Sequence, residues 1–210
     1  MLFRALSVLL LIPGFAAAGD LQVWNQTEFK FLETDRYTWS VFGGFRLRNR
    51  LSDVYDNRAG AQGKVRLHRR VSLTGGYFHR WYDATGLGFR QENRVYATPE
   101  LLLASRPLRI LSVTPIERSM SLRPGPAYNR YRPRVEIERF RKIVSPFFAQ
   151  EFLFQREGFL RSRSVAGLRY RFESGVAFEA GYLFDSIKTG PHWLPRHAIR
   201  TGLSFGLPHR

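Results

Sequence analysis

The chain has 210 residues, a formal net charge of +16, 44% hydrophobic and 15% aromatic residues, and no cysteine. The absence of cysteine excludes a disulfide framework, thiolate chemistry and acylation of an amino-terminal cysteine. A chain of this length is expected to form one domain. Its basic residues alternate with apolar ones instead of gathering in one tail or on one helix face, and this placement argues against a nucleic-acid-binding protein.

The first eighteen residues have the pattern of a secretory signal peptide. Arg4 precedes the apolar run Ala5–Phe15, and the small residues Ala16–Ala18 follow it, so we expect cleavage after Ala18 and a single domain over residues 19–210. The apolar run is shorter than the ~20 residues that a membrane-spanning helix needs. No later apolar run is long enough for a membrane helix, so membrane residence would require a barrel or binding to the membrane surface.

Alternation of apolar and polar side chains at every second position runs through most of the remaining chain. It is clearest in Ser162–Asp185, where two alternating segments flank the turn residues Glu173–Gly175. This pattern predicts a β-hairpin with one apolar and one polar face. The apolar face could be the core of a soluble sheet or the lipid-facing surface of an outer-membrane barrel.

Eleven segments have such a strand pattern. They are residues 19–32, 37–48, 64–68, 71–82, 89–103, 109–119, 130–140, 143–155, 164–172, 176–185 and 197–207. The first is irregular, because Trp24 falls in its polar row, and Leu51–Gly60 is predicted to be a polar loop. Pro99 and Pro115 each remove one backbone donor, so we expect a bulge or a local break at these positions.

These segments predict an all-β fold, a transmembrane antiparallel up-and-down β-barrel of 10–12 strands. A closed antiparallel barrel of the bacterial kind has an even number of strands. The number would be ten if residues 19–32 lay outside the wall, or twelve if a strand were hidden in the proline-rich middle. Twelve is preferred, because the mature chain then divides into strands of ~9–11 residues with short connections.

In such a barrel the polar rows face the lumen. The charged residues predicted to face it are Arg46, Arg48, Lys64, Arg66, Arg80, Arg90, Glu92, Arg94, Arg130, Arg132, Arg134, Glu136, Glu138, Glu151, Arg169, Arg171, Glu179 and Arg200. One interpretation is an arginine-rich lumen closed by ion pairs between neighbouring strands, giving a structural barrel or a narrow channel. The alternative is a porin whose excess positive charge favours small anions.

Two further interpretations compete with these. A lipid-modifying barrel enzyme would need a nucleophile beside a histidine base, but His68, His79, His192, His197 and His209 are scattered without a known catalytic or metal-ligand spacing. We therefore predict no catalytic residues, metal site, cofactor or enzymatic activity. A soluble periplasmic β-sheet protein binding an anionic polymer would not need aromatic residues along one face of nearly every strand.

Several short stretches, taken in order, are similar to one family. They are QVW at Gln22–Trp24, ENR at Glu92–Arg94, RYRPRVEIERF at Arg130–Phe140, EF at Glu151-Phe152, RSRSVAGLRYRF at Arg161–Phe172, GY at Gly181-Tyr182, and His197 followed by GLSF in the last strand. The chain thereby resembles the bacterial outer-membrane β-barrels catalogued as domain of unknown function 2490. The resemblance implies the outer membrane of a Gram-negative bacterium, with membrane lipid and the barrel-assembly machinery as partners, and it implies no activity.

Overall fold

The computed structural model describes residues 21–48, 51–83, 88–122, 127–141 and 143–207, and the predicted signal peptide lies outside them. Thirteen strands account for most of these residues. They are β1 (Leu21–Glu33), β2 (Tyr37–Arg48), β3 (Asp53–His68), β4 (Val71–Tyr82), β5 (Arg90–Ala104), β6 (Arg109–Val113), β7 (Ile116–Ser121), β8 (Tyr128–Tyr131), β9 (Arg134–Glu138), β10 (Val144–Gln155), β11 (Gly158–Arg171), β12 (Ala177–Thr189) and β13 (His192–Gly206). Within the described ranges, no helix is long and apolar enough to cross a membrane.

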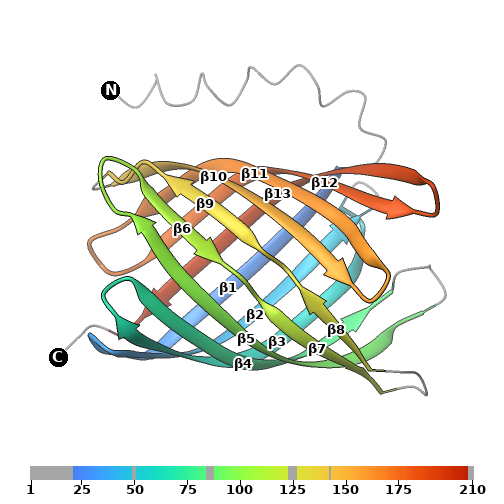
Figure 1. Ribbon diagram of the computed structural model, residues 1–210, viewed down its shortest axis with the longest axis horizontal. Coiled ribbons are helices and arrows are strands. Elements are labelled where there is room, and N and C mark those ends of the chain that lie inside the picture. Colours follow the sequence, from blue (N-terminus) through green and yellow to red (C-terminus); the bar gives the residue numbers. More distant parts are fainter. Residues whose placement is uncertain (1–20, 49–50, 84–87, 123–126, 142, 208–210) are drawn as a thin grey trace.

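The strands close into one barrel (Figure 1). Strands β1 to β5 form an antiparallel meander, and so do β10 to β13. Between the two meanders, two wall positions are each built from two short strands. Strands β6 and β7 share the position beside β5, and both pair with it. Strands β9 and β8 share the next position, where β9 pairs with β6, β8 pairs with β7, and both pair with β10. The thirteen strands therefore occupy eleven positions in the wall, and the predicted all-β barrel is confirmed.

The barrel closes through a parallel pair. Strand β1 runs parallel to β13, from Leu21 opposite His197 to Lys30 opposite Gly206, whereas the other pairs are antiparallel. Parallel closure permits an odd number of positions, so the expectation of an even number was wrong. The first segment belongs to the wall as β1, and the proline-rich middle adds no twelfth position.

Three prolines lie in consecutive positions of the wall. The Thr114 amide donates to the carbonyl oxygen of Pro99 at 3.1 Å, and the Arg132 amide donates to that of Pro115 at 2.9 Å. Pro115 separates β6 from β7, as predicted, and Pro133 separates β8 from β9. Each break falls where a proline cannot donate to the neighbouring strand.

The break predicted at Pro99 does not occur there. Strand β5 continues through Pro99, which is paired with Leu73, and its register shifts later, between Leu102 and Ala104. The Pro99 carbonyl faces the gap between β6 and β7. In an antiparallel ladder a residue's nitrogen faces the same neighbour as its carbonyl, so the missing donor leaves the β4–β5 ladder intact.

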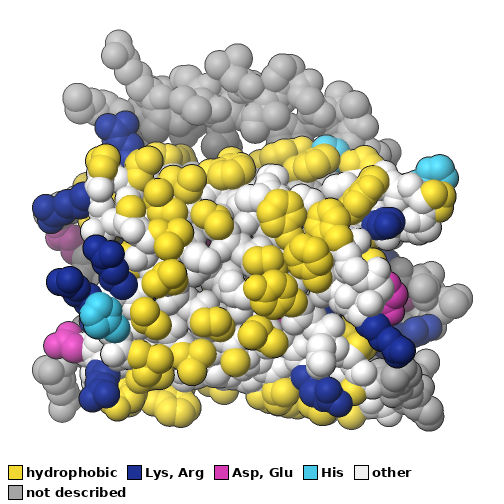
Figure 2. All heavy atoms as spheres, in the orientation of Figure 1, with side chains coloured by type: hydrophobic (Ala, Val, Ile, Leu, Met, Phe, Trp, Pro, Cys, Tyr) yellow, Lys and Arg dark blue, Asp and Glu magenta, His cyan; other side chains and the backbone are white. Residues whose placement is uncertain are grey.

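The outer surface of the wall is apolar. On β2 the side chains of Trp39 and Val41 are exposed, whereas those of Ser40 and Phe42 are buried. Every position in the wall carries at least one exposed large hydrophobic side chain. In the view of Figure 2 these side chains cover the middle of the barrel, and Lys and Arg gather toward its two ends.

The interior contains a small apolar cluster and many charges. Trp24, Phe147, Val165, Leu183 and Ala198 form the apolar cluster. The side chains that are almost completely buried include Glu92, Glu138, Asp56 and Asp185. Buried charges must be paired to be tolerated, and their pairing organises the interior.

Candidate functional site

A chain of ion pairs runs around the inside of the barrel. It consists of ten alternating residues, here called the belt: Arg46, Asp56, Arg80, Glu92, Arg94, Glu117, Arg132, Glu151, Arg163 and Asp185. Successive members are joined by nitrogen–oxygen distances of 2.5 to 3.4 Å. In the order of the belt, its members come from β2, β3, β4, β5, β7, the β8–β9 junction, β10, β11 and β12. The belt therefore connects most strands of the wall by ion pairs.

Arg46 at one end of the belt and Arg163 near the other end meet at Trp24 on β1. The guanidinium carbon of Arg46 lies 4.0 Å from the centroid of the Trp24 ring, and that of Arg163 lies 4.8 Å from it. Such contacts are electrostatically attractive. The indole nitrogen donates to Gln22 Oε1 at 3.0 Å, and the Tyr55 hydroxyl donates to the same oxygen at 2.8 Å. Trp24 falls in the polar row because it is the interior partner of two arginines.

The carboxylates of the belt are buried and each contacts two arginines. The exposed fraction is at most 7% for Asp56, Glu92, Glu117, Glu151 and Asp185. Asp185, the last member, contacts Arg161 at 3.3 Å as well as Arg163. Because every carboxylate lies between two guanidinium groups, its negative charge is compensated from both sides.

A second set of ion pairs lies on β6, β9, β11, β12 and β13. Arg169 is its centre, with contacts to Glu136 at 3.0 Å, Glu138 at 2.9 Å and Glu179 at 2.6 Å. The remaining members of this Arg169 cluster are Arg109, Arg134, Arg171 and Arg200. The close pair Glu136 and Glu138 is therefore held by arginines, as expected of ion-pair partners on one strand.

The residues predicted to face the lumen fall into four groups. The belt contains Arg46, Arg80, Glu92, Arg94, Arg132 and Glu151, and the Arg169 cluster contains Arg134, Glu136, Glu138, Arg169, Arg171, Glu179 and Arg200. Arg48 pairs with Asp53 and Asp83, Lys64 pairs with Glu100, and Arg130 donates to the Tyr128 hydroxyl. Arg66 and Arg90 are exposed near strand ends and join neither network.

The sequence did not identify Asp56 and Arg58 as interior residues, because Leu51–Gly60 was predicted to be a loop. That prediction is wrong. Strand β3 begins at Asp53 and includes both residues. Asp, Asn and Gly are depleted in strands, so this sequence has a weak strand pattern. The ion pairs that Asp56 forms with Arg46 and Arg80 supply a cross-strand attraction that local propensity does not reveal.

Five other network residues were also missed, and the alternation could have identified three of them. Arg161 and Arg163 continue the row of Arg169 and Arg171 backward along β11, and Asp185 continues the row of Glu179 along β12. The other two, Arg109 and Glu117, lie on either side of the break at Pro115, where the pattern is mixed.

Three cavities follow one another along the interior. The central cavity has a volume of about 210 Å³. A cavity of about 750 Å³ lies toward the rim at which β2, β4, β10 and β12 end, and one of about 390 Å³ lies toward the opposite rim. Belt arginines line both the central and the largest cavity, so the belt lies where these two cavities meet.

The histidines that the structure describes do not form a common site. His79 Nδ1 lies 2.7 Å from Asn93 Oδ1, and His197 contacts the Tyr182 hydroxyl. Among the described residues, no group of three or more His, Asp or Glu side chains could hold a metal ion. The interactions that the described interior residues show are ion pairs between arginines and carboxylates.

Residues 21–194 match the model of a family described as "Protein of unknown function (DUF2490)". Comparison with curated proteins and with solved structures gave no match.

Proposed function

The chain belongs to the family of proteins of unknown function DUF2490, and from its fold and its belt we propose that it is an outer-membrane β-barrel of a Gram-negative bacterium whose lumen is closed by ion pairs. It serves as a structural barrel or a very narrow channel and has no enzymatic activity. Membrane lipid surrounds it, and the barrel-assembly machinery inserts it.

The distribution of side chains across the wall carries this proposal. Exposed apolar side chains surround the barrel while charged ones are buried within it, which is the reverse of a soluble protein. Soluble monomers rarely expose apolar patches larger than a few hundred Å². A barrel in a membrane, by contrast, presents an apolar band to lipid and a polar interior.

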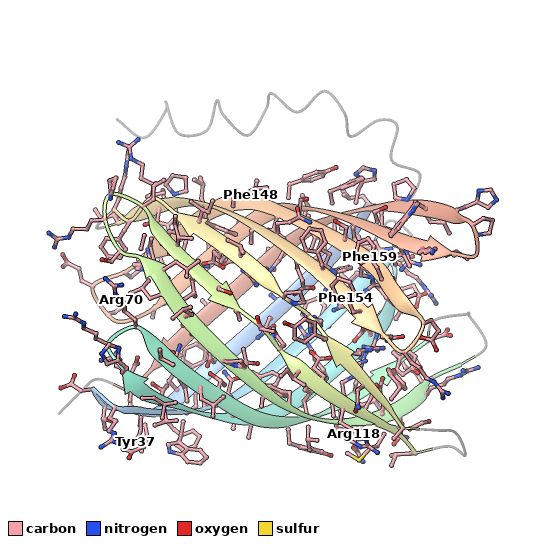
Figure 3. All side chains as sticks on the ribbon, viewed as in Figure 1. Tyr37, Arg70, Arg118, Phe148, Phe154 and Phe159 are labelled. Carbon is pink, nitrogen blue, oxygen red and sulfur yellow. The ribbon has the colours of Figure 1, made fainter. Side chains whose placement is uncertain are left out.

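The aromatic side chains support the same orientation. Tyr37 and Trp39 are exposed toward one end of the barrel, and Phe159 packs against Phe154 and Trp193 toward the other. Figure 3 shows Tyr37 and Arg70 at one end and Phe159 toward the other. Aromatic girdles at both interfaces are typical of outer-membrane barrels.

The belt supports a closed lumen. Barrels of about this size can be filled by their own side chains, and here arginines meet buried carboxylates of neighbouring strands around a central cavity of about 210 Å³. Charges that are paired in this way attract and pass a solute less readily than free charges do.

Conductance of the refolded protein in a planar bilayer tests this proposal. We expect no measurable conductance from the refolded protein. Heat-modifiable migration on a gel verifies that this protein is folded. Steady anion-selective steps would instead support the anion-preferring porin, a second candidate favoured by the basic lining of the largest cavity. A chain that stays monodisperse in buffer without detergent would contradict both and favour a soluble periplasmic protein that binds an anionic polymer.

A further inference from the structure

The largest cavity has an unusual lining. It has a volume of about 750 Å³, and its described lining contains ten arginines and one lysine but no aspartate or glutamate. The five belt carboxylates do not line it, although belt arginines do. The guanidinium groups therefore face the cavity, while the carboxylates that compensate them lie behind.

Two interior arginines of this cavity form no ion pair with a described carboxylate. Arg58 donates to the neutral Gln26 Oε1 at 2.8 Å. Arg130 donates to the Tyr128 hydroxyl at 2.8 Å, and its Nε is buried without a hydrogen-bond partner. Lys188 and Arg196 add positive charge among the exposed residues of the same lining.

The opposite cavity differs in charge. It has a volume of about 390 Å³ and is lined by Glu28, Glu33 and Glu100 together with Lys30, Lys64 and Arg66. Lys30 pairs with Glu33, and Lys64 pairs with Glu100. The interior is thus polarised along its axis, with uncompensated positive charge at one end only.

Like charges held together in a site of low dielectric repel one another unless an anion joins them. Guanidinium groups match phosphate oxygens in shape and hydrogen bonding, often with two parallel bonds. A volume near 750 Å³ is within the range of pockets that hold small molecules, roughly 300–1,000 Å³. Several phosphate groups on one ligand would satisfy several arginines at once.

We propose that this cavity binds a multiply phosphorylated anion, with Arg58 and Arg130 as its principal ligands. The ligand is either a free organic polyphosphate or the phosphorylated headgroup of a lipid, which share the same clustered phosphate chemistry. The site depends on the barrel and its cavity and does not depend on a closed lumen or on a membrane location.

Binding of sodium triphosphate tests the site. Calorimetric titration measures its binding to the full chain, refolded in an uncharged detergent at low ionic strength. The variants Arg58→Gln and Arg130→Gln are titrated in the same way. Arg66→Gln is the control, because it removes an equal charge from the opposite cavity. Loss of one charge-assisted hydrogen bond should weaken binding by about tenfold or more in each of the first two variants. The Arg66→Gln variant should bind like the unmodified chain.

Two additional arms make the result decisive. Arg58→Lys keeps the positive charge but loses the planar guanidinium group, so it should retain part of the affinity for triphosphate. Heat-modifiable migration verifies that each variant is folded. Competition by micelles doped with a bis-phosphorylated glycolipid would identify a lipid headgroup as the natural source, and lack of competition would identify a free anion. Absence of triphosphate binding, or equal losses in the Arg58, Arg130 and Arg66 variants, would overturn the proposal whatever the conductance of the barrel.

Discussion

At the scale of the residue, the stability of the interior depends on carboxylates shared between arginines. Asp185 is completely buried and contacts Arg161 at 3.3 Å and Arg163 at 3.1 Å. Arg163 has a second partner in Glu151, whereas Arg161 pairs with no other described carboxylate. Removing one partner from a buried pair leaves an uncompensated charge.

We therefore expect Asp185→Asn to lower the free energy of unfolding by about 3 kcal/mol or more, the cost of breaking a buried pair. Urea unfolding of the protein in detergent micelles, followed by the shift between folded and unfolded bands on a gel, measures the change. Glu157→Gln removes the same charge from an exposed turn and should change the free energy by less than about 0.5 kcal/mol. Equal effects of the two substitutions would refute the importance of the belt.

At the scale of the element, adjacent strands approach closely where glycines face one another. Gly167 on β11 is paired with Gly181 on β12. A Cβ atom added to Gly167 would lie 2.3 Å from the Ala180 carbonyl oxygen, which is a backbone atom and cannot move independently. At Gly75 on β4 the nearest atom to an added Cβ is 4.0 Å away.

Gly167→Ala should accordingly destabilise the barrel by about 1–3 kcal/mol, as overpacking does, while Gly75→Ala should be neutral or slightly stabilising. The unfolding midpoints of the two variants in micelles provide the comparison. A Gly75→Ala variant as unstable as Gly167→Ala would show that loss of glycine itself, and not the close strand approach, is responsible.

The parallel pairing of β1 with β13 can be tested by cross-linking. Asn25 is paired with Thr201, and its Nδ2 donates to Thr201 Oγ1 at 3.0 Å. The chain has no cysteine, so Asn25→Cys with Thr201→Cys should give a single disulfide on mild oxidation, detected as faster migration of the unreduced, denatured chain. Thr27→Cys with Thr201→Cys is two residues out of register and should react much more slowly; the reverse order of rates would exclude this register.

At the scale of the whole molecule, the proposed closure of the interior depends on the centre of the belt. Arg132 and Glu151 form a pair at 2.8 Å in the middle of it. Replacing both with serine removes two long side chains without changing the net charge. We expect Arg132→Ser with Glu151→Ser to conduct in a planar bilayer where the unmodified protein is silent.

The matched control is Lys64→Ser with Glu100→Ser, which removes a neutral pair toward one rim. It should remain silent. Conductance by the control and not by the belt variant would place the constriction elsewhere.

Alternation in the sequence predicted the barrel and most of its faces, because a period of two residues is a local property of a strand. It predicted less well wherever distant partners decide the structure. Asp56 and Arg58 lie in a segment with poor strand propensity, and only their neighbours on β2 and β4 explain why it is extended. Trp24 looked irregular because its two arginine partners are on β2 and β11. The number of wall positions depends on the pairing of the first strand with the last, which no local pattern specifies.

Parallel closure has a consequence for what each end of the chain can reach. Because β1 and β13 run in the same direction, Leu21 and Gly206 emerge at opposite rims. A barrel that closes in this way would, in a membrane, present Leu21 on one side and Gly206 on the other.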